Sequence, residues 1–291
     1  MPEAAHRRGL AFIHLATLMA GATGLFGKWV TAGPSVITGG RTLVAFLTLI
    51  VVARIRGIPL RIAGGRRRAL TLLSGVLLAA HWWTFFHAIA VSSVSVTLLA
   101  LASYPLFTVL LEPLVFREKY RGGDFAAAAV VAAGLALVGH DGGAAAPAGL
   151  AWGMLSGAIF SGVALISRAV VSDTPPVTVA ANQQFAAMLV SLPFALAAPG
   201  VFEARPLILV AILGLVFTAG LQTLFVAGLR HVGARTASIV LMLEPVYGIA
   251  FAWAVFGERP TVAMLAGGAL IGGAAGAVTL AHAKTRRRHS A

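Results

Sequence analysis

Residues 243–281 read LEPVYGIAFAWAVFGERPTVAMLAGGALIGGAAGAVTLA, and this stretch decides the class of the protein. Two apolar runs flank the short polar link 257–260, and Glu244 is the only charged residue outside that link. The first run begins upstream, near Ala234. Because a helix needs about 20 apolar residues to cross a membrane, the stretch predicts two membrane-spanning helices joined by a tight turn.

The composition extends this prediction to the whole chain. Of the 291 residues, 59% are hydrophobic and 11% are charged, whereas an ordinary soluble domain has roughly half and a quarter. The mean hydropathy is +0.91. At about 20 residues for each crossing, the chain holds at most about ten spans. We therefore predict an all-α integral membrane protein with ten transmembrane helices, at 9–30, 35–53, 69–90, 94–116, 125–139, 150–170, 176–196, 207–229, 234–256 and 262–282.

The distribution of charge predicts the orientation. The net charge is +13, but the basic residues form short clusters between apolar runs, which is typical of membrane topology and not of nucleic-acid binding. With the N-terminus in the cytoplasm, 18 of the 22 Lys and Arg residues fall on cytoplasmic segments. The positive-inside rule therefore predicts a multi-pass protein with both termini in the cytoplasm. We expect its membrane to be the bacterial inner membrane.

The two halves of the chain share a pattern at a constant spacing. Pro105, Phe116 and Glu118 recur as the same residue types 140 positions later. The chain therefore divides into two repeats, 1–145 and 146–291. Five helices per repeat place the second copy in the membrane with inverted topology, an arrangement common to secondary transporters.

Three motifs connect these repeats to a family. They are Phe256-Gly-Glu-Arg-Pro followed by the glycine-rich run from Gly267, the matching Phe116-Arg-Glu-Lys, and Leu243-Glu-Pro-Val. Together they resemble the EamA repeat of the drug/metabolite transporter (DMT) superfamily. The resemblance covers nearly the whole chain, and it implies a ten-helix transporter that is not an enzyme.

Two further segments resemble one branch of that superfamily. His81-Trp-Trp-Thr-Phe-Phe-His87 and Ser103-Tyr-Pro are similar to segments of the YddG-type exporters of aromatic amino acids. The resemblance implies export of amino acids, aromatic ones preferred, by alternating access. Other readings stay open: a multidrug or other metabolite exporter of the same fold, a membrane-embedded enzyme, or a channel.

Polar and aromatic residues inside apolar helices are the candidates for lining a substrate cavity, because a polar group at that depth needs a partner, a proton or water. Glu244 could receive an ammonium group or carry a proton, or it could fix helix packing. Trp82 could stack on a planar substrate or face lipid, and Gln222 is its counterpart at the 140-residue offset. The cavity candidates are His14, His81, Trp82, Tyr104, Gln222 and Glu244.

Two prolines and one arginine also lie inside predicted helices. Pro105 and Pro245 fall near the middle of the fourth and ninth predicted helices, where each would remove a backbone donor and either kink the helix or serve in gating. Arg41, in the second helix, could meet a substrate carboxylate. We expect it instead to snorkel to the outer interface.

The predicted partners are a small-molecule substrate and the lipid bilayer. No nucleotide-binding loop of the GxxxxGK type is present, and His81 and His87 face different sides of one helix, so we expect no cofactor and no metal site. The glycine-rich tenth helix, with Gly267 and Gly268, should pack closely against a partner helix, either within the chain or in a homodimer.

Overall fold

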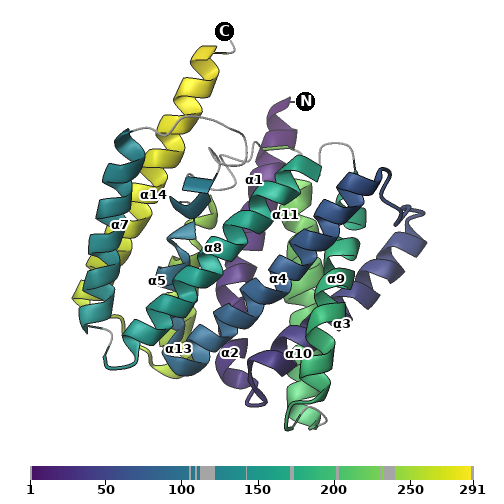
Figure 1. Ribbon diagram of the computed structural model, residues 1–291, viewed down its shortest axis with the longest axis horizontal. Helices are drawn as coiled ribbons and strands as arrows, with labels where there is room; N and C mark the ends of the chain where they lie inside the picture. The colour runs from purple at the N-terminus through teal and green to yellow at the C-terminus, as the bar shows by residue number, and fades with distance from the viewer. Residues whose placement is uncertain are drawn as a thin grey trace.

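The computed structural model describes residues 2–104, 106–108, 110–111, 122–141, 143–170, 174–200, 203–229, 231–232 and 240–289, and all regular structure in these ranges is helical. Figure 1 shows the arrangement. The elements are α1 (Pro2–Thr23), α2 (Phe26–Trp29), α3 (Gly33–Ile55), α4 (Gly65–Val91), α5 (Val94–Leu101), α7 (Gly122–Asp141), α8 (Ala146–Val170), α9 (Pro176–Leu196), α10 (Ala204–Gly214), the π-helix η2 (Leu215–Gly220), α11 (Leu221–Leu229), α13 (Glu244–Phe256) and α14 (Val262–His289).

Six helical segments in the described part of the chain are long and apolar enough to cross a membrane: Ala4–Trp29, Gly33–Ile55, Gly65–Val91, Ala146–Ser167, Pro176–Leu196 and Ala204–Phe225. Four shorter apolar helices accompany them: Val94–Thr108, Phe125–Asp141, Glu244–Phe256 and Val262–Ala274. Each segment overlaps one predicted helix. The all-helical membrane fold is thus confirmed, while ten crossings stay a prediction.

Two predicted helices are interrupted at equivalent positions. The fourth helix, expected to run without a break from residue 94, turns at Ala102 and Ser103, and the ninth turns at Met242 and Leu243, 140 positions later. Pro245 consequently lies in the first turn of α13. The expectation that it lies near the middle of a helix was wrong. A first-turn proline breaks no helical hydrogen bond, because the first amides of a helix have no partner within it.

Three other expectations about the helices have definite outcomes. The first predicted helix, 9–30, was wrong in its continuity, since α1 ends at Thr23 and α2 begins at Phe26, with Gly24 at the break. The seventh predicted helix coincides with α9 at both ends. Pro105 and Glu118, which the sequence analysis singled out, lie outside the described residues.

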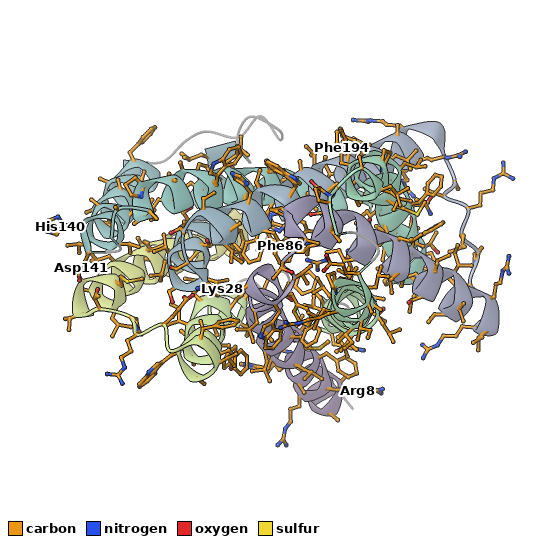
Figure 2. The ribbon with its side chains drawn as sticks, turned by 90° about the horizontal axis from the view of Figure 1, so that it is seen from below. Arg8, Lys28, Phe86, His140, Asp141 and Phe194 are labelled. Carbon is orange, nitrogen blue, oxygen red and sulfur yellow. The ribbon has the colours of Figure 1, made fainter. Side chains whose placement is uncertain are left out.

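The helices form a bundle in which distant segments pack side by side. α3 packs against α9 and α4, α4 against α8, and α7 against α14. The N-terminal end of α1 and the C-terminal end of α14 lie at the same end of the bundle (Figure 1). Phe86 is fully buried in the largest hydrophobic core and lies near the middle of the bundle (Figure 2).

Glycines set the closest helix contacts. A Cβ atom on Gly267 of α14 would lie 2.5 Å from the carbonyl oxygen of Gly134 on α7, and one on Gly134 would lie 2.7 Å from the Gly267 carbonyl. Only residues without a side chain allow two backbones to approach this closely. The close partner predicted for the tenth helix is therefore α7 of the same chain.

Candidate substrate site

Arg41 of α3 lies in the interior of the bundle. Its side chain is 3% exposed, and its guanidinium carbon lies 4.1 Å above the centre of the Trp82 ring and 5.5 Å from that of Phe86. Eight residues of helix separate Arg41 from Gly33, about 12 Å along the axis. The expectation that Arg41 snorkels to the interface was therefore wrong, since its side chain turns inward onto α4.

Small residues next to Arg41 explain how α3 can bury it. A Cβ atom on Gly39 would lie 2.5 Å from Ala195 Cβ on α9, and one on Gly40 would collide with Val210 on α10. A Cβ on Gly214 would lie 3.0 Å from the Arg41 carbonyl oxygen. The glycines let α9 and α10 approach α3 on both sides, so the arginine is enclosed by protein.

The π-helix η2 supplies the hydrogen-bond partner of Arg41. Arg41 Nε donates to Thr218 Oγ1 over 3.0 Å, and Thr218 Oγ1 donates its own hydrogen to the carbonyl of Leu213 over 2.9 Å. Because that hydroxyl hydrogen is committed, the oxygen is left to accept from the arginine. π-Helical turns of this kind occur frequently at functional sites.

His81, next to Trp82 on α4, joins α4 to α8. Ser156 Oγ lies 2.8 Å from His81 Nδ1 and 2.9 Å from the His81 carbonyl oxygen. The consistent assignment is that the serine donates to the carbonyl and accepts from Nδ1–H. The His81 ring also lies 4.9 Å from that of Phe160. These contacts give His81 a packing role.

Tyr104 and Glu244 follow the two symmetric turns. The Tyr104 ring lies 5.4 Å from Phe160, and its carbonyl accepts a hydrogen bond of 2.7 Å from Ser161. Its hydroxyl is buried without a hydrogen bond to the described part of the chain. Glu244 is half-buried, it interacts electrostatically with Tyr104, and its carboxylate has no hydrogen bond or ion pair among the described residues. Neither side-chain group has a polar partner among the described residues.

A chain of aromatic contacts connects these two groups of residues. Tyr104 contacts Phe160, Phe160 contacts His81, and His81 is next in the sequence to Trp82, over which the Arg41 guanidinium lies. We call Arg41, His81, Trp82, Tyr104 and Glu244, with the intervening Phe160, the central site. It holds a cation at one end and a carboxylate at the other, with aromatic rings between them.

Four of the predicted cavity residues, His81, Trp82, Tyr104 and Glu244, fall in the central site. His14 does not, because it lies on the exposed face of α1 with Leu15 and Leu18. Gln222 instead belongs to an amide network, where it donates to Gln183 over 3.1 Å and accepts from Gln184 over 3.5 Å. The 140-residue offset that pointed to Gln222 gives no information about this network.

The amide network ties four helices together. Gln183 of α9, 2% exposed, donates to Ser74 of α4 over 2.8 Å and to Ser167 of α8 over 2.9 Å. Its oxygen accepts from Gln222 of α11. Buried amides of this kind fix the positions of the helices that carry them, because each unmade hydrogen bond would be costly. The network therefore supports the scaffold around the central site.

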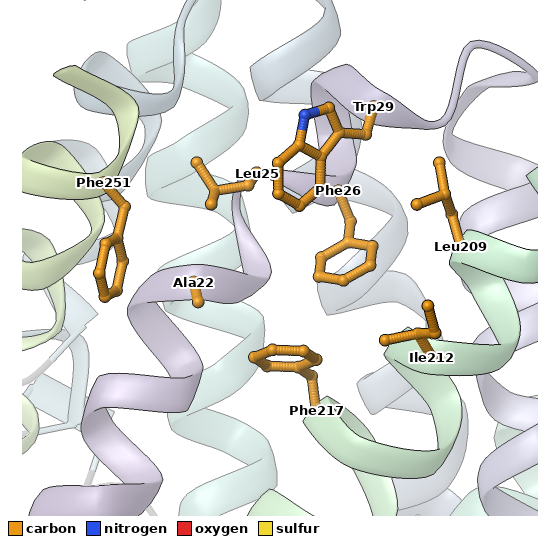
Figure 3. A pocket seen from close by; sticks show the side chains of 8 residues that line it. All are labelled: Ala22, Leu25, Phe26, Trp29, Leu209, Ile212, Phe217 and Phe251. Atoms are coloured by element: carbon orange, nitrogen blue, oxygen red, sulfur yellow. The ribbon is translucent and has the colours of Figure 1, made fainter. Parts of the chain in front are cut away.

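An apolar pocket of about 330 Å³ lies between α1, α2, α10, η2 and α13 (Figure 3). The rings of Phe26 and Phe217 lie 5.2 Å apart in its wall, and Trp29 lies 5.4 Å from Phe26. All its lining residues are apolar: Ala22, Leu25, Phe26, Trp29, Leu209, Ile212, Phe217 and Phe251.

An ion pair lies at the end of the bundle where α3 begins. Lys28 of α2 pairs with Glu258, which follows α13, and Lys28 also lies over the ring of Phe256. The Glu258 carboxylate accepts 3.3 Å hydrogen bonds from the backbone N and the hydroxyl of Ser95, in the first turn of α5. This contact, which we call the Lys28 latch, joins segments from both halves of the chain; Lys28 is labelled in Figure 2.

The EamA-like transporter family model matches residues 7–139 and again residues 147–280. The chain belongs to the EamA-like transporter family. This is a family of membrane transporters in the DMT superfamily, and membership implies a bilayer around the apolar helices. The resemblance stated from the motifs is confirmed at the level of the family.

Two known proteins are similar to this EamA-like transporter. The uncharacterized transporter YwfM of Bacillus subtilis (strain 168) is 29% identical over 181 residues, which is 60% of this chain and 61% of that protein. A solved crystal structure matches with a TM-score of 0.67 at 20% identity, over 96% of this chain and 98% of the other. The structural match shows the fold alone. Neither match names a substrate, so the similarity to aromatic amino-acid exporters stays a prediction.

Proposed function

We propose that this protein is a secondary transporter of the bacterial inner membrane that exports small organic metabolites, with amino acids, above all aromatic ones, as its substrates. The observation that carries the proposal is the central site, where Arg41 and Glu244 lie inside an apolar bundle without a described partner of opposite charge. An amino acid brings the complementary pair, a carboxylate and an ammonium group. Phe160 and Trp82 offer apolar surface to its side chain.

We further propose ten crossings in two inverted repeats, 1–145 and 146–291, with both termini cytoplasmic. Three observations support this architecture. One family model matches both halves, the interrupting turns recur at the 140-residue offset, and the two chain ends lie at one end of the bundle (Figure 1). In such a repeat, the halves rock around a fixed site near the midplane. We propose that the Lys28 latch closes the outer end of the bundle.

Uptake into liposomes tests the proposed function. Purified protein is reconstituted, and the flux of radiolabelled phenylalanine, tryptophan, threonine and alanine is measured with and without a proton gradient. We expect saturable flux with phenylalanine and tryptophan preferred. Flux that does not saturate would indicate a channel, and aliphatic preference would contradict the aromatic substrate class.

A second candidate function rests on the apolar pocket. Its lining has no polar side chain, which suits a hydrophobic organic compound better than an amino acid. A multidrug exporter of the same fold would use this pocket in place of the central site. Efflux of a lipophilic cationic dye that persists in Arg41→Gln and Glu244→Gln, together with no amino-acid flux in the wild type, would favour this second function.

A further inference from the structure

We infer that Arg41 is the anion-binding residue of the central site and that the ligands of this protein carry a carboxylate, which the free edge of its guanidinium group receives. The inference rests on the proposed function and deepens it, because it names the chemical group by which substrates are recognised. It also assigns a role to a residue that the sequence alone would place at the membrane interface.

The first step is the charge balance around Arg41. No acidic side chain forms an ion pair with it within the described ranges, and its Nη1 atom is buried without a hydrogen bond there. A charge in a membrane interior is costly unless it is paired or hydrated. The rings of Trp82 and Phe86 compensate part of this cost. A missing anion accounts for the rest.

The second step is the geometry of the guanidinium group. Trp82 covers one face of its plane at 4.1 Å, and Nε is occupied by Thr218 at 3.0 Å. The edge that carries the two Nη atoms is thus the part left for a ligand. That edge presents two parallel N–H donors, and a carboxylate accepts them bidentately. Thr218 and Trp82 hold the fork in place before the ligand arrives.

The hydrogen bonds of Arg41 do not fit a purely structural role. An arginine that only fastens α3 to α4 and η2 would use its hydrogen-bond donors on these helices. Arg41 uses one described bond, to Thr218. The other end of the central site holds a second buried group without a hydrogen bond to the described residues, the hydroxyl of Tyr104. Buried polar atoms without partners in one site indicate that the site is built for a polar ligand.

A pair of ligands that differ only in charge tests the inference. The purified protein in detergent is titrated with 3-phenylpropanoate and with 3-phenylpropanamide, and binding is measured by calorimetry and by the rise in melting temperature that a ligand of the folded state causes. We expect the wild type to bind the carboxylate about tenfold to a hundredfold more tightly than the amide, as a charge-assisted bidentate contact predicts. This comparison needs no substitution.

Variants then assign the preference to Arg41. Arg41→Gln should bind both compounds equally, and Arg41→Lys should keep a reduced preference because it keeps the charge but loses the fork. Arg205→Gln, which removes an exposed arginine of α10, is the matched control and should behave as the wild type. If Arg41→Gln does not fold, Thr218→Val keeps Arg41 but frees its Nε, and it should weaken the carboxylate without removing the preference.

The outcomes separate this inference from the proposed function. Equal binding of the two compounds by the wild type overturns it, as does a preference that survives in folded Arg41→Gln. A preference that depends on Arg41, in a protein that moves no amino acid in liposomes, supports the anion site and removes only the proposed amino-acid substrates.

Discussion

At the scale of single residues, Tyr104 and Glu244 occupy equivalent places in the two halves but carry different chemistry. Each follows a turn that interrupts its helix, and the two lie within electrostatic reach of each other. Glu244 is half-buried and unpaired in the described part of the chain. A carboxylate in that setting favours a cationic ligand or a proton as its partner.

We predict that Glu244→Gln lowers transport and removes its dependence on pH. Glutamine keeps the shape and hydrogen bonding of glutamate but cannot carry charge or release a proton. The measurement is initial flux into liposomes from mildly acidic to mildly basic pH, at equal amounts of reconstituted protein. Glu203→Gln removes an exposed acid just before α10 and serves as the control. A variant that keeps wild-type flux and the wild-type pH profile would remove Glu244 from the mechanism.

Tyr104→Phe separates function from stability. The Tyr104 hydroxyl is buried with no hydrogen bond to the described residues, and such a group costs about 1–3 kcal/mol. Removing it should therefore leave the melting temperature unchanged or raise it, while transport falls if the hydroxyl contacts the substrate. Thermal unfolding in detergent and liposome flux are measured on the same preparation. A lower melting temperature with unchanged flux would contradict this prediction and assign the hydroxyl a structural role.

The outcome for single residues shows what sequence patterns can and cannot locate. Glu244, Tyr104 and Trp82 were predicted because polar or aromatic residues near the middle of apolar helices are unusual. Arg41 was wrongly predicted to lie at the membrane interface, because its position along α3 is compatible with snorkelling. The close approach of α9 and α10 at Gly39 and Gly40 encloses its side chain in the bundle. His14 could not be assigned a face without knowing which side of α1 meets α11 and α13.

At the scale of elements, the sequence pattern indicated where the predicted helices are interrupted but not the form of the interruptions. Pro245 was recognised as a helix-breaking residue, yet it begins α13 and kinks no helix. The π-helix η2 had no signal in the sequence analysis, because the hydrophobic pattern of residues 207–229 continues across it without a change. Its extra residue per turn matters because it places Thr218 against Arg41.

The Lys28 latch is the element-scale contact with a consequence for mechanism. Glu258 connects α2 to the first turn of α5, where free backbone amides and the helix dipole favour a carboxylate. We predict that Lys28→Gln loosens this end of the bundle and exposes the central site. In Tyr104→Cys, the thiol should then react several-fold faster with a charged maleimide. The chain has no native cysteine, so this thiol is unique.

Charge reversal distinguishes the ion pair from other effects of the substitution. Lys28→Glu alone should accelerate labelling further, and Lys28→Glu combined with Glu258→Lys should restore slow labelling, since the pair re-forms with its charges exchanged. Labelling of Glu203→Cys, exposed outside the central site, should not respond to any of these changes. Slow labelling in every Lys28 variant would show that other contacts keep this end closed.

At the scale of the whole molecule, the orientation in the membrane decides which end the Lys28 latch closes. The arginine-rich loop between α3 and α4 lies at the same end of the bundle as the two chain ends (Figure 1), and Arg56 and Arg61 are exposed there. Glu203, at the start of α10, lies at the opposite end (Figure 1). By the positive-inside rule, we predict that the arginine-rich end faces the cytoplasm.

Single cysteines in the otherwise cysteine-free chain test this orientation. Glu203→Cys should react with an impermeant maleimide added to intact spheroplasts, and Arg61→Cys should react only after the membrane is opened, because the two positions lie on opposite sides of the bilayer. The opposite labelling pattern would mean that the protein has the reverse orientation in the membrane. The Lys28 latch would then close the cytoplasmic end. In that orientation, the structure would be open to the outside, where substrate is released, and closed to the cytoplasm, from which substrate enters.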